Sequence, residues 1–241
     1  GYKLNTFTIS DASYSGNFDL VKFLVSVKCK HNELGIFGAI SGKHIHILKY
    51  LISINCQLSN ILGLAKIIGS QGTIDILNYM ILHYPDLNNS YYKYVICSHA
   101  ARNCNIEILN HAIINNYELK SCIFDAAKGG NLNVILLLKK YNPNIKITIG
   151  VFAYACSSGN LELVQYLYNN YYNIIKNKNN TSCFKYATFY NRINIMNFLL
   201  QNNFAVNIEK LIKHNLYKKV KIETKNWVNT FLIKNNGGVN L

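Results

Sequence analysis

The 241-residue sequence predicts an all-α solenoid of stacked helix-turn-helix units. Three observations predict this fold class. A small-x-x-x-Gly-Asn pattern recurs seven times at intervals of about 30 residues, each copy continues into an apolar run with helical spacing, and a small residue usually precedes the turn by four places. Repeats of this length are typical of stacked architectures, in which each copy buries its apolar face against its neighbours.

The turn of each copy is marked by one residue, which we number position 0. The seven residues at position 0 are Gly16, Lys43, Gly72, Cys104, Gly130, Gly159 and Asn191. They are separated by 27, 29, 32, 26, 29 and 32 residues. The copy "ACSSGNLELVQYL", which begins at Ala155, shows the pattern most plainly. The small and polar residues around position 0 predict a turn between two helices.

The second helix of each copy is predicted from the residues after the turn. Apolar residues occupy positions +2, +4, +5 and +8, and the last three of these lie on one face of a helix. In the sixth copy this buried stripe is Leu163, Val164 and Leu167. Position +12 is Asn in four copies, namely Asn55, Asn116, Asn142 and Asn203. Asn tolerates the left-handed backbone conformation, so we expect the second helices to end there.

The first helix of each copy is predicted from a mostly apolar series at position −7. The residues of this series are Ile9, Ile36, Ala65, Cys97, Ile123, Phe152 and Phe184. They predict a first helix that is shorter than the second. The small residue at position −4, such as Ala155, is expected to let the two helices approach closely.

The domain organisation follows from these copies. We expect seven repeats in residues 1–205 and a degenerate, basic capping repeat with a tail in residues 206–241. The turn of this repeat is predicted at Glu223, because Leu216 then falls at position −7, Trp227 and Val228 at +4 and +5, and Phe231 at +8. We interpret the unit as a cap, because a terminal unit needs a polar outer face. The sequence starts at Gly1 without an initiator Met, so we expect a fragment or a processed product. A monomer is expected.

The copies resemble ankyrin repeats, whose second half reads approximately Ala-Ala-x-x-Gly-His-x-x-x-Val-x-x-Leu-Leu-x-x-Gly-Ala. The resemblance covers roughly residues 6–205, although the Thr-Pro that starts the family's first helix is absent from every copy. The richness in Asn, Ile and Tyr is similar to that of the ankyrin-repeat proteins of giant DNA viruses. The resemblance implies a non-enzymatic scaffold that binds another protein on its concave face, without a cofactor or a small-molecule substrate.

Candidate partner-binding residues are implied by the resemblance, since that family meets its partners with hairpin tips and with residues just before the turns. A tip in the fourth copy is expected to hold Tyr91, Tyr92 and Tyr94. The other candidates, near the turns, are Arg102, Lys128, Tyr154, Phe189 and Tyr190. Tyr and Arg dominate the energetics of many interfaces. The alternative, that these tyrosines reflect biased codon usage on an idle surface, stays open.

The charge suggests a second function. The net charge is +14, and residues 176–241 contribute 11 of the 25 Lys and Arg against two acidic residues. The residues of this alternative polyanion-binding or nucleic-acid-binding segment are Lys210, Lys213, Lys218, Lys219, Lys221 and Lys225. A solvated capping face or codon bias explains the same charge, and no nucleic-acid-binding motif accompanies it.

Metal binding and catalysis are disfavoured by the spacing of the candidate residues. Cys97, His99, Cys104 and His111 lack the two close pairs of a zinc site, and His44 and His46 are expected to point to different faces of a helix. The acidic residues are scattered over predicted surface positions. We therefore expect no metal, cofactor or catalytic set.

Location is predicted from the cysteines and the apolar runs. Seven cysteines without paired spacing indicate free thiols in a reducing compartment. No apolar window reaches the ~18–20 residues of a membrane span. We expect an intracellular, cytoplasmic protein, in the host cytoplasm if the source is viral.

Overall fold

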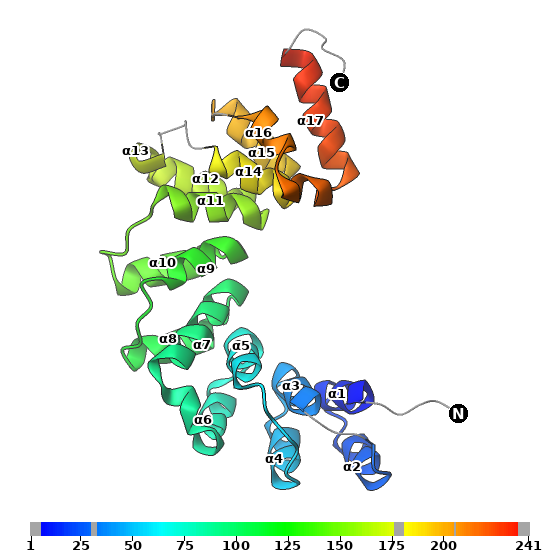
Figure 1. The fold of residues 1–241 in the computed structure, drawn as a ribbon. Helices are drawn as coiled ribbons and strands as arrows, with labels where there is room; N and C mark the ends of the chain where they lie inside the picture. The colour runs from blue at the N-terminus through cyan, green and yellow to red at the C-terminus, as the bar shows by residue number, and fades with distance from the viewer. Residues whose placement is uncertain (1–5, 30–32, 176–180, 205, 236–241) are drawn as a thin grey trace. The chain divides into compact units, whose positions relative to one another are not determined.

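A computed structural model describes residues 6–29, 33–175, 181–204 and 206–235. Its contacts divide the chain into two compact units, Gly1–Cys122 and Ile123–Leu241, which we call the N-terminal unit and the C-terminal unit. Every regular element within these described ranges is a helix, so the predicted all-α class is confirmed. Figure 1 shows that each unit is a stack of helix pairs.

The N-terminal unit holds four helix pairs and one connecting 3-10 helix. The pairs are α1 (Thr6–Tyr14) with α2 (Phe18–Ser26), α3 (Glu33–Ser41) with α4 (Ile45–Ser53), α5 (Ile61–Gln71) with α6 (Ile74–His83), and α7 (Ser90–Asn103) with α8 (Ile106–Ile114). The 3-10 helix η1 (Pro85–Asn88) joins α6 to α7.

The C-terminal unit continues the same plan with α9, whose first residue is the last of the N-terminal unit. Its pairs are α9 (Cys122–Gly129) with α10 (Leu132–Tyr141), α11 (Ile149–Ser158) with α12 (Leu161–Asn170), and α14 (Ser182–Phe189) with α15 (Ile193–Gln201). The further helices are α13 (Tyr172–Ile175), α16 (Ile208–Ile212), η2 (Asn215–Lys219) and α17 (Ile222–Asn235).

First helices of neighbouring pairs pack closely against one another. Helix α1 lies along α3, and α5 lies along α7. Two glycines allow this approach, because a Cβ at Gly38 would lie 2.3 Å from the Ser10 carbonyl oxygen and a Cβ at Gly69 would lie 2.2 Å from that of Ile96. The first helices of the N-terminal unit therefore form one layer, and in the C-terminal unit α11 lies along α14.

The turn at position 0 is left-handed in six of the seven copies. The backbone φ is +78° at Gly16, +61° at Lys43 and +59° at Cys104, and it is also positive in the last three copies. Gly72 differs, with a φ of −69°. The next residue, Thr73, is extended as well, which suits a β-branched side chain.

The residue at position +1 holds neighbouring copies together and starts the second helix. The Asn160 side chain accepts a hydrogen bond from the Leu163 N–H at 3.1 Å and donates one to the Gly130 carbonyl at 2.8 Å. Asn105 does the same, accepting from Ile108 and donating to Gly72. Both ends of the amide are used, so one residue type caps a helix and bridges two copies.

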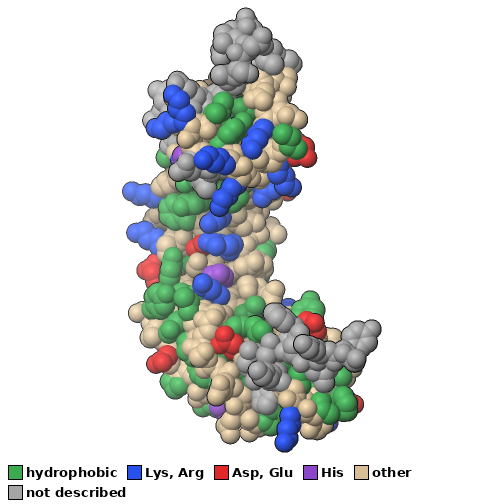
Figure 2. All heavy atoms as spheres, turned by 45° about the vertical axis from the view of Figure 1, so that its right-hand side comes forward, with side chains coloured by type: hydrophobic (Ala, Val, Ile, Leu, Met, Phe, Trp, Pro, Cys, Tyr) green, Lys and Arg blue, Asp and Glu red, His purple; other side chains and the backbone are tan. Residues whose placement is uncertain are grey.

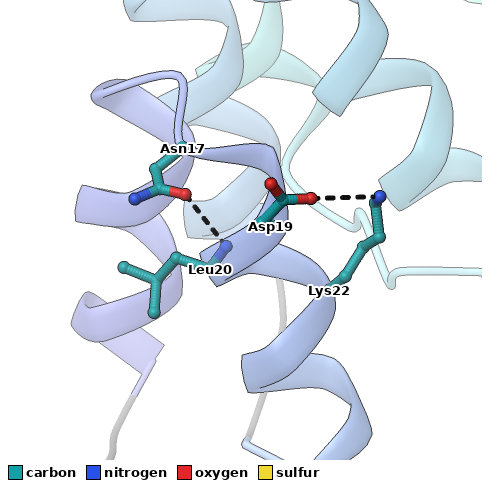
Figure 3. Close-up of polar contacts among 4 residues, drawn as sticks. All are labelled: Asn17, Asp19, Leu20 and Lys22. Carbon is teal, nitrogen blue, oxygen red and sulfur yellow. Dashed lines mark hydrogen bonds and ion pairs between the residues drawn. The ribbon is translucent and has the colours of Figure 1, made fainter.

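The buried stripe of the second helix lies where the spacing predicts it. The side chains at positions +5 and +8 are buried in all seven copies, and those at position +4 are buried in six. Leu20, at position +4 of the first copy, is 39% exposed although Asn17 caps its helix as in other copies (Figure 3). The pair α1 and α2 is the first that the structure describes, so it has a described neighbouring pair on one side only.

Helix lengths and ends differ from the sequence prediction in several places. As described, the first helix is shorter than the second only in the fifth and seventh copies, and the two have equal lengths in the first, second and sixth copies. In the third and fourth copies the first helix is the longer one, with 11 residues in α5 against 10 in α6 and 14 in α7 against 9 in α8. Of the Asn residues at position +12, Asn55, Asn116 and Asn203 are left-handed, but Asn142 has a φ of −134°. Pro143 follows Asn142 and restricts it to extended conformations.

The C-terminal turn was predicted three residues too late. Glu223 lies in the first turn of α17, which starts at Ile222. The Lys221 N–H donates to the Asn191 side chain at 2.7 Å, so Lys221 takes the place that position +1 has in the other copies. The predicted boundary at residue 205 lies outside the described residues and stays a prediction.

Candidate functional site

The three clustered tyrosines of the N-terminal unit are helical and do not form a hairpin tip. Tyr91, Tyr92 and Tyr94 lie in the first turns of α7, where Asn89 caps the helix by accepting from the Tyr92 N–H at 2.9 Å. Tyr91 is 56% exposed and Tyr94 is 43% exposed. The Tyr91 and Tyr92 ring centroids lie 5.1 Å apart. The predicted tip is wrong because the favourable N-cap at Asn89 lets α7 start early.

Arg102 is not part of this tyrosine cluster. It lies in the last turn of α7, whereas Tyr91 lies in the first. A helix rises about 1.5 Å per residue, so the two residues are separated by roughly 16 Å along the axis. The structure therefore gives the N-terminal unit two separate candidate positions.

The C-terminal unit carries a row of aromatic side chains across its first helices, which we call the aromatic ladder: Phe124 on α9, Tyr154 on α11 and Tyr186 on α14. The Tyr154 and Tyr186 rings are stacked, with centroids 5.7 Å apart and an interplanar angle of 17°. The Phe124 ring meets Tyr154 edge to face at 6.1 Å. Phe124 is 37% exposed and both tyrosines are half-buried, so the ladder is accessible on one side.

Phe124 and Tyr186 were missed by the sequence analysis, which named only Tyr154 of this ladder. Tyr154 and Tyr186 both stand at position −5 of their copies, and equivalent positions of adjacent copies lie side by side in a stack. Their shared position in the repeat would have predicted that the two rings lie side by side. Phe124 stands at position −6, one residue away, so the register alone would not have found it.

One end of the ladder continues into a basic group on α14. The Lys185 ammonium lies 5.7 Å from the centroid of the Phe189 ring, and the His214 ring lies 4.8 Å from the same ring. Tyr190 follows α14 and is exposed. Lys128 lies in the last turn of α9 and is half-buried. The predicted residues Phe189 and Tyr190 thus lie together, and Lys128 lies on another first helix.

A cavity of about 140 Å³ opens beside Lys185. Its apolar floor includes the buried Phe184 and Leu211. Lys185, Lys210 and His214 contribute basic side chains, and the other lining residues are Thr181, Ser182 and Asn207. None of the acidic side chains that the structure describes lines it. We call it the cationic cavity.

The predicted basic segment is split by the structure. Lys210 lines the cationic cavity, whereas Lys218, Lys219 and Lys221 are exposed on η2 and on the connection to α17. The Lys225 ammonium lies near the Lys218 carbonyl at 3.3 Å, and Lys213 is exposed after α16. Trp227 of α17 is stacked on Phe231, and its ring N–H donates to the Asn197 side chain at 3.0 Å.

The candidate metal ligands do not converge. Among the residues that the structure describes, no group of three His, Cys, Asp or Glu side chains could hold a metal ion. Burial raises the pKa of Cys97 to about 12, whereas Cys104 is exposed in its turn. The His44 and His46 rings lie only 5.9 Å apart, closer than predicted, because His44 precedes α4 as its N-cap and is not part of the helix.

Helix length and apolarity decide whether a helix can span a membrane. No helix within the described ranges is long and apolar enough to cross one.

Comparison with known proteins identifies the repeats of the C-terminal unit. No curated protein matches the chain in sequence. Residues 123–210 match the family model described as ankyrin repeats in three copies. The matched range covers the helix pairs α9–α10, α11–α12 and α14–α15. This part of the chain is therefore similar to three consecutive ankyrin repeats.

Proposed function

We propose that the chain is a non-enzymatic scaffold that binds another protein through the concave face of its repeat stack, formed by the first helices. Ankyrin repeats are generally protein–protein interaction modules, and residues 123–210 match their model. The observation that carries the proposal is the aromatic ladder, Phe124, Tyr154 and Tyr186, which is partly exposed across three consecutive first helices. Aromatic side chains bring large contact areas at low entropic cost, and Tyr adds a hydroxyl that can hydrogen-bond.

Three features support a binding role over catalysis and over an idle surface. The cationic cavity has no acid–base pair beside it among the described side chains, since its titratable members are two lysines and one histidine. The aromatic side chains of the ladder belong to adjacent helices and contact one another, which holds each ring in place. Rings held in this way lose little entropy when a partner binds.

The experiment is capture of binding partners from an extract by the full chain, followed by affinity measurement with the purified partner. Tyr154→Ala with Tyr186→Ala should weaken binding by about 30-fold or more, because a true interface anchor is worth ~2 kcal/mol. The matched control is Tyr141→Ala with Tyr172→Ala, which removes two exposed tyrosines outside the first helices. Equal losses in both variants would refute the assignment of the face.

The N-terminal unit provides a second test of the same proposal. The exposed Tyr91 and Tyr94, and Arg102 at the other end of α7, are candidate contacts for the partner. Tyr91→Ala with Tyr94→Ala tests one end of the helix and Arg102→Ala tests the other. A partner that spans both units should lose affinity in these variants as well.

A second candidate function is binding of nucleic acid or another polyanion by the C-terminal basic segment. It is supported by the exposure of Lys213, Lys218, Lys219 and Lys221. Charge reversal at Lys218, Lys219 and Lys221 tests it, together with a salt titration. Binding through phosphates should weaken steeply as the salt concentration rises, whereas an interface anchored by aromatic side chains should be much less sensitive.

The proposed location is intracellular and cytoplasmic. Six of the seven cysteines are buried and the seventh, Cys104, is exposed as a free thiol. Free thiols are typical of reducing compartments.

A further inference from the structure

We propose that the partner presents an acidic, extended peptide segment to the C-terminal unit, with apolar side chains on the aromatic ladder and a carboxylate in the cationic cavity. This inference rests on the proposed function, because it names the chemistry of the partner on the same face. Three observations carry it: the charge of the C-terminal unit, the make-up of the cavity, and the connection between the cavity and the ladder.

The charge of the whole chain is concentrated in the C-terminal unit. Residues 123–241 contain 15 Lys and Arg against four Asp and Glu, a net charge of +11, whereas residues 1–122 carry +3. Of the acidic side chains described in this unit, Asp125 is buried, Glu162 lies on α12 and Glu223 lies on α17. Figure 2 shows Lys and Arg side chains among hydrophobic ones on the face of this unit that it draws. An acidic partner is the electrostatic complement of such a surface.

The cationic cavity is suited to a carboxylate on a short side chain. Its volume of about 140 Å³ holds a carboxymethyl or carboxyethyl group, and Lys185 and Lys210 bring two ammonium groups to it. The methylene groups of an Asp or Glu side chain would contact the floor formed by Phe184 and Leu211. Charge-assisted hydrogen bonds from ammonium groups to a carboxylate are roughly twice as strong as neutral ones.

The cavity and the ladder are joined through α14. Tyr186, a member of the ladder, directly follows Lys185, which lines the cavity. An extended peptide advances about 3.3 Å per residue, so roughly four residues cover a ladder whose neighbouring ring centroids are 6.1 and 5.7 Å apart. Because Lys185 and Tyr186 are consecutive residues of α14, the proposal places the acidic side chain at the end of the segment nearest the Lys185 ammonium. A short extended segment therefore reaches both features.

Single-stranded nucleic acid fits this face less well than a peptide. Proteins that bind single strands do so with open aromatic faces, on which the bases stack. Tyr154 and Tyr186 are stacked on each other at 5.7 Å, and the edge-to-face contact with Phe124 occupies a further part of Tyr154. Each tyrosine of the ladder therefore has at most one ring face left for a base, whereas aliphatic side chains and peptide groups can also contact ring edges and hydroxyl groups.

The test is fluorescence anisotropy with the full chain and three labelled probes at physiological ionic strength. The probes are an octapeptide of alternating Glu and Leu, the same peptide with Gln in place of Glu, and single-stranded octathymidylate. The Glu peptide should bind about tenfold more tightly than the Gln peptide, because only the carboxylate gains charge-assisted bonds. Octathymidylate should bind more weakly than the Glu peptide.

Two variants and their controls assign the binding to the site. Lys185→Gln with Lys210→Gln should remove the preference for Glu over Gln. The control is Lys140→Gln with Lys146→Gln, which removes the same charge from exposed positions on α10 and the loop after it and should preserve the preference. Tyr154→Ala with Tyr186→Ala should weaken the binding of the Glu peptide and of the Gln peptide by the same factor. Circular dichroism checks that every variant keeps the helical fold.

The outcomes separate this inference from the proposed function. No preference for Glu, equal effects of the two lysine variants, or tighter binding of octathymidylate would each overturn the acidic-peptide inference. Loss of a captured protein partner in the Tyr154 and Tyr186 variant, without a preference for Glu, would uphold the proposed function and refute only the partner chemistry. A Glu preference that depends on Lys185 and Lys210, together with unchanged partner capture by the tyrosine variant, would refute the proposed function instead.

Discussion

Asn160 offers a direct test of how neighbouring copies are joined. Its side-chain oxygen accepts from the Leu163 N–H at 3.1 Å, and its side-chain nitrogen donates to the Gly130 carbonyl at 2.8 Å. The first contact caps α12, and the second bridges to the preceding turn. Asn160→Ala removes both contacts. Asn160→Ser keeps a capping oxygen, but its hydroxyl is too short to reach Gly130.

The two substitutions should have different magnitudes. Loss of an N-cap costs about 1 kcal/mol, and a part-buried neutral hydrogen bond contributes about 1 kcal/mol. Asn160→Ala should therefore lower the free energy of unfolding by ~2 kcal/mol, and Asn160→Ser by ~1 kcal/mol. Gly130 is buried, so its carbonyl loses its partner in both variants and the ~1 kcal/mol assigned to this hydrogen bond is a minimum.

The assay is urea unfolding followed by circular dichroism, combined with hydrogen exchange of the amides in α10 and α12. Repeat arrays often unfold in parts, so exchange reports which copies lose protection. The Ser variant should lose protection at the boundary between the two copies while the start of α12 stays protected. The bond to Gly130 would be shown to contribute nothing if the Ser variant were as stable as the wild type and the Ala variant lost only the ~1 kcal/mol of the N-cap.

Two further predictions concern the core. Leu163→Ala should cost ~2–5 kcal/mol, whereas Leu20→Ala at the same position of the first copy should cost less than ~1 kcal/mol because Leu20 is 39% exposed; equal costs in urea unfolding would contradict the register. Burial raises the pKa of Cys56 to about 11 and of Cys97 to about 12 from a usual value of 9.0. As the pH rises above 9.0, the thiols therefore ionise in the unfolded chain before they ionise in the folded one. The free energy of unfolding is unaffected below this pH and falls between 9.0 and the folded pKa values. For each thiol the slope approaches ~1.4 kcal/mol per pH unit. Cys97→Ala should reduce this slope, and an unchanged pH profile would contradict the assignment.

The fold was predictable because the repeat imposes the same chemistry in every copy. Buried side chains recur at positions −7, +5 and +8, and each of these positions carries apolar residues throughout the sequence. Because residues three and four apart share one face of a helix, the recurring apolar residues form a buried face in every copy. The length of α7 was not predictable in this way, because its extension depends on a single N-cap at Asn89 that belongs to no repeated position.

Helix ends were less predictable than helix existence because each depends on one or two residues. Asn142 has the residue type that favours a left-handed end, yet Pro143 removes that conformation. Lys43 and Cys104 adopt left-handed turns that their residue types disfavour, because the packing of the two flanking helices fixes the backbone there. The preference of the single residue sets the backbone conformation at a helix end only where packing does not constrain it; elsewhere the stacking of the helices sets it.

The positions that stacking leaves free are the ones on which a partner can be specified. Position −5 is Asp11, Gly38, Ile67, His99 and Asp125 in the first five copies, so the stack does not require an aromatic residue there. Tyrosine nevertheless occupies this position in both of the last two copies, and the two rings stack on each other while staying half-exposed. The core does not require this aromatic pair, and exposing part of its apolar ring surface to water is unfavourable. A partner that covers the exposed surface would remove this unfavourable free energy. This reasoning favours Tyr154 and Tyr186, on α11 and α14, over the other candidates that residue type alone suggested.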